Sequence, residues 1–174
     1  RYMNKLVNPP RLDKEGVGGG QITVQPGMFY RDFEKLTLEK GLILPCFTAS
    51  KSINAMGGMF GNNSAGERTL KYGQTEDYIL ETKIVFADGV ERIVKPIPLS
   101  EVSKHGEIYT KIYDLIKNNE EEIKNAKPRV HKNSAGYYIW NVEKDGIFDL
   151  NKLLVGSQGT LGIATEITFK LVQE

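Results

Sequence analysis

The chain has 174 residues, of which 40% are hydrophobic and 26% are charged, a balance typical of one globular domain or of two small lobes that share a core. A formal net charge of +1 gives no general electrostatic reason to expect binding to nucleic acid or to an anionic membrane. No apolar run approaches a bilayer span or reads as a signal peptide, and the single cysteine, Cys46, excludes an internal disulfide. We expect Cys46 to be a small buried or half-buried side chain.

The first part of the chain predicts a strand followed by a helix. Residues 21–25 alternate polar and β-branched side chains, and a Pro-Gly pair closes this strand. Phe29, Phe33 and Leu36 recur at helical spacing, which predicts a helix that buries these three side chains. Gly41 is placed to end that helix.

Later segments add a hairpin, helices and a last strand. Residues 78–95 predict a β-hairpin, because an Asp-Gly pair at 88–89 is a strong two-residue turn signal. Apolar spacing predicts four further elements: helices over 108–116, 120–126 and 150–154, the last with Asp149 as its N-cap, and a strand over 163–171. Because helices interleave with prominent hairpins, an α+β fold is favoured over a doubly wound parallel sheet.

The most informative stretch is residues 52–66. These fifteen consecutive residues carry no charge but include four glycines, three asparagines and two hydroxyl side chains. The glycines allow the main chain to approach a ligand closely, and successive N–H groups can form a concave anion site. The stretch therefore predicts a loop that cradles the diphosphate of a nucleotide.

Two other stretches have similar chemistry. Residues 155–163 contain three glycines, two hydroxyls and one amide without a charge, and residues 132–138 are small and polar before two tyrosines. Either could be an ordinary turn, but a long cofactor needs several backbone contacts. The glycine-rich tract 16–20 precedes a strand, whereas a phosphate loop follows one, so we interpret it as a flexible hairpin connection.

Several motifs in order resemble a known family. They are ITVQPG, GGMFGNNSAG, LKYGQTEDYILETKIVFADG, KNSAGY and LLVGSQGTLGIATEITFKL. Together they resemble the FAD-binding domain of the vanillyl-alcohol-oxidase (PCMH-type) flavoproteins, in the branch with D-lactate dehydrogenases and glycolate oxidase. The resemblance implies an α+β fold with a mainly antiparallel sheet flanked by helices. Residues 1–174 would form a partial FAD-binding domain, mostly its second subdomain, without most of the first subdomain and without the substrate-binding cap.

The resemblance also implies which residues hold FAD. Carried over by motif, the main chain around the glycine pair would line the diphosphate and ribityl region, with further contacts near the flavin and the adenine. The implied cofactor-binding residues are Pro45, Asn54, Met56, Gly57, Gly58, Asn63, Ser64, Ala65, Gly66, Gly162 and Ile163. The loop that attaches FAD covalently in some relatives has no counterpart here, so non-covalent binding is expected.

As implied by the resemblance, the whole enzyme would oxidise a small 2-hydroxy acid, such as D-lactate or glycolate, by hydride transfer to FAD. The electron acceptor is not assigned, and no nucleic acid is expected as a partner. The missing subdomain and cap of the same polypeptide are the expected partners of these 174 residues, which alone should be inactive and bind FAD weakly or not at all. A cytoplasmic location is expected, with peripheral membrane attachment of the whole enzyme left open.

No catalytic or metal-binding residue is assigned. His105 is expected at the surface, while His131 stands beside the small polar stretch and could lie near the ligand. Lys71 and Tyr72 could contact an anion or brace a turn, and Trp140 is expected in the core. Three alternative functions remain: a flavin subunit of a molybdenum hydroxylase, a cell-wall precursor reductase, and a non-catalytic scaffold.

Overall fold

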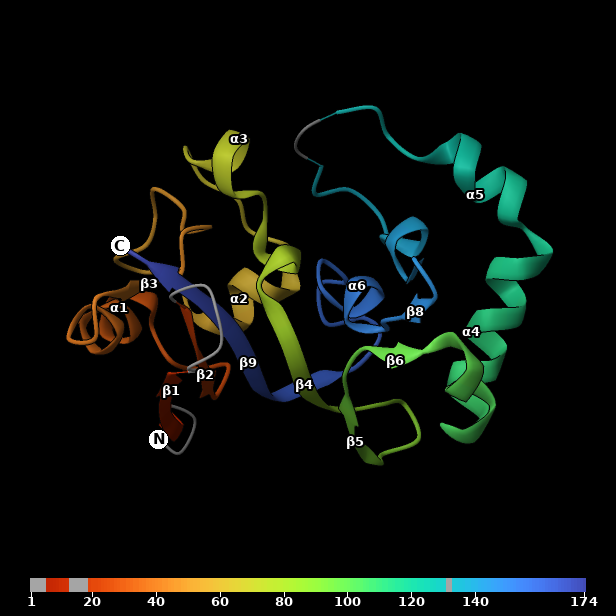
Figure 1. Cartoon of the computed structure of the whole chain (residues 1–174), viewed down its shortest axis with the longest axis horizontal. Coiled ribbons are helices and arrows are strands. Elements are labelled where there is room, and N and C mark those ends of the chain that lie inside the picture. The colour runs from red at the N-terminus through yellow and green to blue at the C-terminus, as the bar shows by residue number, and fades with distance from the viewer. Residues whose placement is uncertain (1–5, 13–18, 131–132) are drawn as a thin grey trace.

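A computed structural model describes residues 6–12, 19–130 and 133–174. Its main element is a twisted antiparallel sheet with strand order β1-β2-β9-β4-β5, and β3 pairs with the end of β9 (Figure 1). The strands span Leu6–Leu12 (β1), Gly19–Val24 (β2), Leu42–Ile43 (β3), Ile79–Val85 (β4), Glu91–Val94 (β5) and Ile163–Gln173 (β9). The α+β class and the mainly antiparallel sheet flanked by helices are thereby confirmed.

Strand β9 organises the sheet because it pairs with both β2 and β4. Its side chains alternate, so that Ile167, Phe169 and Leu171 are fully buried on one face. On the other face, the hydroxyl groups of Thr23 and Thr168 lie 2.8 Å apart in a partly buried pair. One face of the sheet therefore covers the core while the other is more polar, as is common for antiparallel sheets.

The hairpin of β4 and β5 is confirmed, but its connection differs from the predicted two-residue turn. The Gly89 N–H donates to the Phe86 carbonyl at 2.9 Å, and the Phe86 N–H donates to the Val90 carbonyl at 3.2 Å. Gly89 has φ +75°, so it occupies the left-handed position that follows a type I turn in a three-residue hairpin loop. Arg92 closes the loop with an ion pair of 2.6 Å to Asp88.

Helix α1 spans Tyr30–Leu38 and buries Tyr30, Phe33 and Thr37. The predicted buried face was therefore wrong in part: Phe29 precedes the helix as its N-cap residue and Leu36 is only half-buried. Tyr30, and not Phe29, is buried in the core, because the Tyr30 hydroxyl can donate to a backbone carbonyl there. Gly41 has φ +66° just after the helix, as predicted.

Helices α1 and α6 (Asn151–Leu154) pack against the same face of the sheet: the Phe33 ring contacts Phe169, and Asn151 accepts from the Thr82 hydroxyl at 2.6 Å. The predicted helices over 108–116 and 120–126 are confirmed as α4 and α5, which form the right edge of the view. Besides α1 and the strands of the main sheet, the described residues form α2 (Met56–Gly61), α3 (Thr69–Tyr72), η1 (Thr75–Asp77), β6 (Ile97–Pro98), η2 (Leu99–Lys104), α4 (Glu107–Asn118), α5 (Glu120–Ala126), η3 (Ile139–Asn141), β7 (Glu143–Lys144), β8 (Ile147–Phe148) and α6 (Asn151–Leu154).

The glycine-rich tract and the start of α6 differ in part from the predictions. In the glycine-rich tract, residues 16–18 lie outside the described residues, while Gly19 and Gly20 begin β2 and pair with β9. Leu150, not Asp149, is the N-cap residue of α6. Asp149 still contributes to the start of the helix, because its carboxylate accepts the backbone N–H of Asn151 at 3.0 Å.

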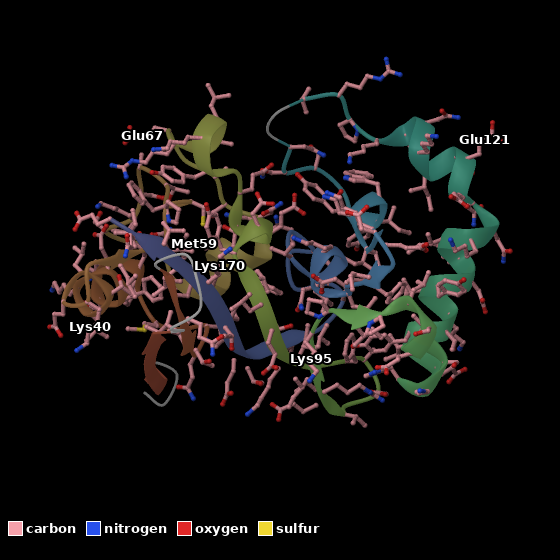
Figure 2. All side chains as sticks on the ribbon, viewed as in Figure 1. Lys40, Met59, Glu67, Lys95, Glu121 and Lys170 are labelled. Carbon is pink, nitrogen blue, oxygen red and sulfur yellow. The ribbon has the colours of Figure 1, made fainter. Side chains whose placement is uncertain are left out.

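One apolar core connects the sheet with α1, α2, α4 and α6. Figure 2 shows charged side chains such as Lys40, Glu67 and Glu121 at the periphery, whereas Met59 of α2 is fully buried. Cys46 is buried, as predicted. In the described parts of the chain, no helix combines the length and the hydropathy that crossing a bilayer requires.

Candidate functional site

The three uncharged stretches lie against one another in the structure. The end of α2 contacts the stretch 155–163 through two backbone hydrogen bonds: the Gly156 N–H donates to the Phe60 carbonyl at 2.9 Å, and the Gln158 N–H donates to the Gly61 carbonyl at 2.8 Å. These bonds fix two segments that are far apart in sequence. The stretches that predicted separate ligand contacts therefore belong to one place in the fold.

The polar stretch 133–138 pairs directly with residues 155–163 and is linked to the stretch 52–66 through Gln74. The hydroxyl groups of Tyr137 and Thr160 lie 2.8 Å apart. The side-chain amide of Gln74 donates to the Asn63 carbonyl at 3.1 Å and to the Asn133 carbonyl at 3.0 Å. Backbone, hydroxyl and amide groups therefore join the three stretches at one place, and such groups are the donors that a polar, extended cofactor requires.

The predicted open loop over residues 52–66 is partly a helix. Residues 56–61 form α2, and the N–H groups of Met56 and Gly57 donate to the carbonyls of Met28 and Pro26, each at 2.8 Å. The Ser64 N–H donates to the Met59 carbonyl at 3.0 Å. A cradle in which all successive amides are free is therefore wrong, because the helix and the turn before α1 use many of them.

The glycines of this stretch differ in what surrounds them. A Cβ at Gly57 would lie 2.6 Å from the Pro26 Cβ, and a Cβ at Gly66 would overlap the carbonyl oxygen of Phe47. A Cβ at Gly58 would have no described heavy atom within 4 Å apart from its chain neighbours and the backbone of its own helix. Gly57 and Gly66 are thus required by packing inside the protein, whereas Gly58 presents an open and exposed main chain.

The other predicted residues reach the surface to different degrees. The side chains of Met56 and Asn63 are fully buried, and that of Ile163 is 67% exposed. The Asn54 amide donates to the Thr48 hydroxyl at 3.3 Å. Three more predicted residues, Pro45, Ser64 and Ala65, are buried. A ligand at this surface would therefore meet mainly backbone from the predicted set, and the apolar Met56 side chain serves the core.

Gly162 also has a packing role. A Cβ at Gly162 would lie 2.9 Å from both the Ile84 side chain and the Val85 carbonyl oxygen. The absence of a side chain lets β9 begin directly against β4, and Ile163 then turns outward. The structure therefore brings Gly162 close to the sheet, and its predicted contact with FAD stays a prediction.

Two buried polar groups lie unsatisfied beside this surface. Asn63 has φ +50°, and its side-chain oxygen accepts the Glu76 N–H at 2.9 Å. Within the described residues, the Asn63 Nδ2 and the Tyr138 hydroxyl are buried without a hydrogen-bond partner of good geometry. Burial and the Glu76 charge raise the pKa of Tyr138, and the nearby side chains of Gln74 and Asn63 oppose this rise. Orphaned buried groups of this kind are expected where a water or a ligand completes the network.

Residues 74–76 were missed as part of the site by the sequence reasoning. Glu76 is buried, its carboxylate accepts from the Asn141 amide at 3.2 Å, and its backbone carbonyl accepts from Lys152 at 2.6 Å. Burial raises the pKa of Glu76, while Asn141 and Lys152 act in the opposite direction. Thr75 donates through its hydroxyl to the Ser64 carbonyl at 2.8 Å. The only signal was the run of polar residues after Gly73.

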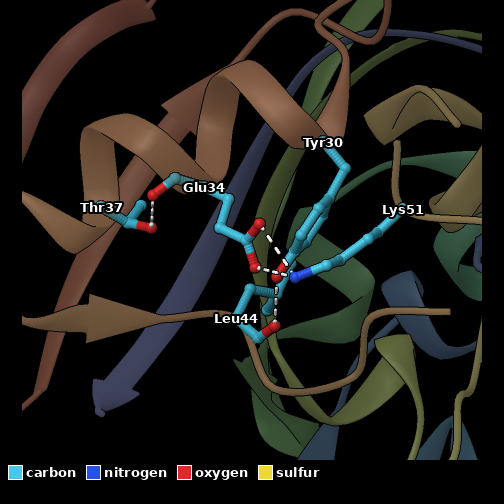
Figure 3. A network of polar contacts seen from close by, with 5 residues as sticks. All are labelled: Tyr30, Glu34, Thr37, Leu44 and Lys51. Carbon is cyan, nitrogen blue, oxygen red and sulfur yellow. Dashed lines mark hydrogen bonds and ion pairs between the residues drawn. The ribbon is translucent and has the colours of Figure 1, made fainter. Parts of the chain in front are cut away.

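Helix α1 holds residues 44–51, the segment that precedes the uncharged stretch 52–66 (Figure 3). The Tyr30 hydroxyl donates to the Leu44 carbonyl at 2.9 Å, and Lys51 donates to Glu34 at 2.8 Å. Next in this segment, Cys46 lies 3.7 Å from the Thr75 hydroxyl, and burial raises the pKa of its thiol to about 12. Cys46 is therefore a packing residue and not a nucleophile.

The remaining candidates have structural roles or lie outside the site. His105 is exposed beside the Tyr109 ring, and His131 lies outside the described residues. Tyr72 braces a turn, because its carbonyl accepts from the Tyr78 hydroxyl at 2.7 Å. Trp140 is half-buried, with its ring centre 5.1 Å from that of Tyr138. Among the described residues, no cluster of three or more His, Cys, Asp or Glu could hold a metal ion.

Comparison with known proteins defines the class. The family described as FAD binding domain matches residues 5–94, which is more than half of the chain. The chain therefore belongs to the FAD binding domain family, and FAD is the cofactor of this class. The solved structure of alkyldihydroxyacetonephosphate synthase has a TM-score of 0.57 and 20% identity over 99% of this chain and 22% of that one, which shows a shared fold.

Three similar proteins are named as an oxidase subunit or a dehydrogenase. The chain is 31% identical over 172 residues to "Glycolate oxidase subunit GlcD" of Bacillus subtilis (strain 168), covering 99% of this chain and 26% of that one. It is 29% identical to the mitochondrial "D-lactate dehydrogenase [cytochrome] 1" of Saccharomyces cerevisiae (98% and 20% covered). It is 26% identical to "D-2-hydroxyglutarate dehydrogenase" of Escherichia coli (strain K12) (95% and 17% covered). The predicted family and branch are confirmed, and the chain spans about a quarter or less of these relatives.

Proposed function

We propose that this chain forms part of the FAD site of a flavin-dependent enzyme that oxidises a 2-hydroxy acid. The observation that carries the proposal is the convergence of three uncharged stretches, at residues 57–66, 133–138 and 156–160, in a chain of the FAD binding domain family. FAD is long, and only several backbone segments held in one place can bind it along its length.

The residues present fit such a cofactor through their main chain and small polar groups. Gly58 offers open backbone. Residues 158–160 are also exposed and contact the end of the same helix, where the Gln158 N–H donates to the Gly61 carbonyl at 2.8 Å. Uncharged donors of this kind can bind a diphosphate without excess positive charge. When bound, FAD would supply the hydride acceptor, while these residues orient it and limit the access of water. We propose that the attachment is non-covalent.

The substrate class follows from what the relatives are named for. Glycolate, D-lactate and D-2-hydroxyglutarate share a carboxylate next to a carbon that bears a hydroxyl group. A protein of this family that contains these 174 residues would therefore take a 2-hydroxy carboxylate. No electron acceptor is assigned. The group that takes the hydroxyl proton is also left unassigned, because His105 is exposed just after η2, where its ring lies 5.2 Å from that of Tyr109.

Spectroscopy of the full-length protein, with whatever segments flank these residues, tests the proposal. The protein should bind added FAD and quench its fluorescence. Under anaerobic conditions, at least one of glycolate, D-lactate and D-2-hydroxyglutarate should bleach the visible flavin band, and L-lactate serves as a stereochemical control. A protein that ignores FAD would instead support the non-catalytic scaffold, and a flavoprotein that none of these acids reduces would contradict the substrate class.

A further inference from the structure

Gln74 joins two of the converging stretches with a single side chain. It is 6% exposed, and its amide nitrogen donates to the carbonyls of Asn63 and Asn133 at 3.1 and 3.0 Å. Its side-chain oxygen accepts the Asn133 N–H at 3.3 Å. The contact with Asn133 therefore pairs amide with amide in both directions, across 59 positions of sequence.

The backbone of Gln74 is itself fixed. Its N–H donates to the Asp77 carboxylate at 2.9 Å, which is half of a capping box at the start of η1. Gly73 precedes it with φ +74°, and its lack of a side chain leaves room for the same carboxylate. Next along the chain, the Thr75 N–H donates to the Ser64 carbonyl at 3.0 Å. Gln74 therefore projects from a rigid turn that is anchored to the end of the glycine stretch.

The stretch 133–138, to which Gln74 is bonded, is more exposed than Gln74 itself. Residues 134–137 are exposed, and within its own stretch the Asn133 side chain bonds to the backbone of Ala135, at 3.0 and 3.2 Å. The stretch 133–138 is attached to the body at its start by Gln74 and near its end by the Tyr137–Thr160 pair. Loss of the first attachment would free the start of the stretch, while the Tyr137–Thr160 pair would still hold its end.

We propose that Gln74 is a positioning residue for FAD: it holds the stretch 133–138 in register with the backbone at Asn63, so that both meet the cofactor together. This inference rests on the proposed function. Gln74 acts through these two segments and need not touch the cofactor. Glutamate cannot replace it, because a carboxylate would face two carbonyl oxygens with no proton to donate.

Three substitutions in the full-length protein test this role: Gln74→Ala, Gln74→Met, which keeps the volume, and Gln173→Ala as a matched control at an exposed position of β9. Gln74→Met should weaken FAD binding about tenfold, the loss expected from one or two net hydrogen bonds. Gln74→Ala should weaken it at least as much. In the FAD-free protein, hydrogen exchange should accelerate at Asn133 in both variants, while Gln173→Ala should match the wild type in both measurements.

The outcomes separate the two proposals. If the wild type does not bind FAD, the proposed function fails, and the positioning role fails with it. If the wild type binds FAD and Gln74→Met binds it equally well, only the positioning role is overturned, even where exchange at Asn133 accelerates. Unchanged exchange at Asn133 would also overturn it, because the attachment would then not hold the stretch. Gln74→Met guards against the case in which Gln74→Ala does not fold.

Discussion

Replacing Gly66 with alanine should lower the free energy of unfolding by about 3 kcal/mol or more, a value at the upper end for overpacked sites. The added Cβ would overlap the carbonyl oxygen of Phe47 and lie 2.9 Å from its carbonyl carbon. Because these neighbours are backbone atoms, no rotamer change can relieve the overlap. Urea unfolding followed by circular dichroism would measure the loss.

The matched control is Gly58→Ala, which makes the same chemical change eight positions earlier in open space. Its stability should equal or slightly exceed that of the wild type, because alanine is favoured over glycine in a helix by about 0.5–1 kcal/mol. Equal stability of Gly66→Ala and wild type would show that residues 66 and 47 do not approach each other as described. The backbone of the stretch 52–66 would then follow a different path.

The second large effect is on cofactor binding. Gly58→Ala should leave the protein folded but weaken FAD about 10- to 100-fold, the equivalent of one lost charge-assisted hydrogen bond. The reason is that Gly58 is exposed with an open face, and a methyl group there would hold the cofactor away from the main chain. Flavin fluorescence titration of the full-length protein would measure the change.

Ser103→Ala, at an exposed position of η2, is the control for a small surface change and should leave FAD affinity unaltered. A Gly58→Ala protein that is folded and binds FAD as tightly as the wild type would remove Gly58 from the site. The pair of glycine substitutions thus distinguishes a glycine needed by the fold from one needed by the ligand, which the sequence motif alone treats alike.

Periodicity predicted the sheet well but the helix face less well. Strands β2 and β9 follow alternation, and Ile167, Phe169 and Leu171 are buried because one face of the sheet covers the core. In α1 the prediction placed Phe29 in the core because it is apolar. Tyr30 is buried instead, because its hydroxyl donates a hydrogen bond to the Leu44 carbonyl. The spacing of apolar residues cannot reveal that a polar group has such a partner.

The candidate site was predicted in composition but not in detail. The uncharged stretches were identified from their residues, yet the partial helix at 56–61 was not, because three glycines among its six residues argue against a helix locally. Tertiary contacts override this preference: the carbonyls of Pro26 and Met28 accept the first amides of α2. Gln74 was missed because its role depends on Asn133, a partner that only the fold brings close.

Hydrogen exchange of the full-length protein with and without FAD tests most directly whether the three uncharged stretches form one cofactor surface. FAD should slow exchange within residues 57–66, 133–137 and 156–160 together, and leave α4, at the far edge of the fold, unchanged (Figure 1). Bound FAD that protects other segments and none of these three stretches would contradict the account.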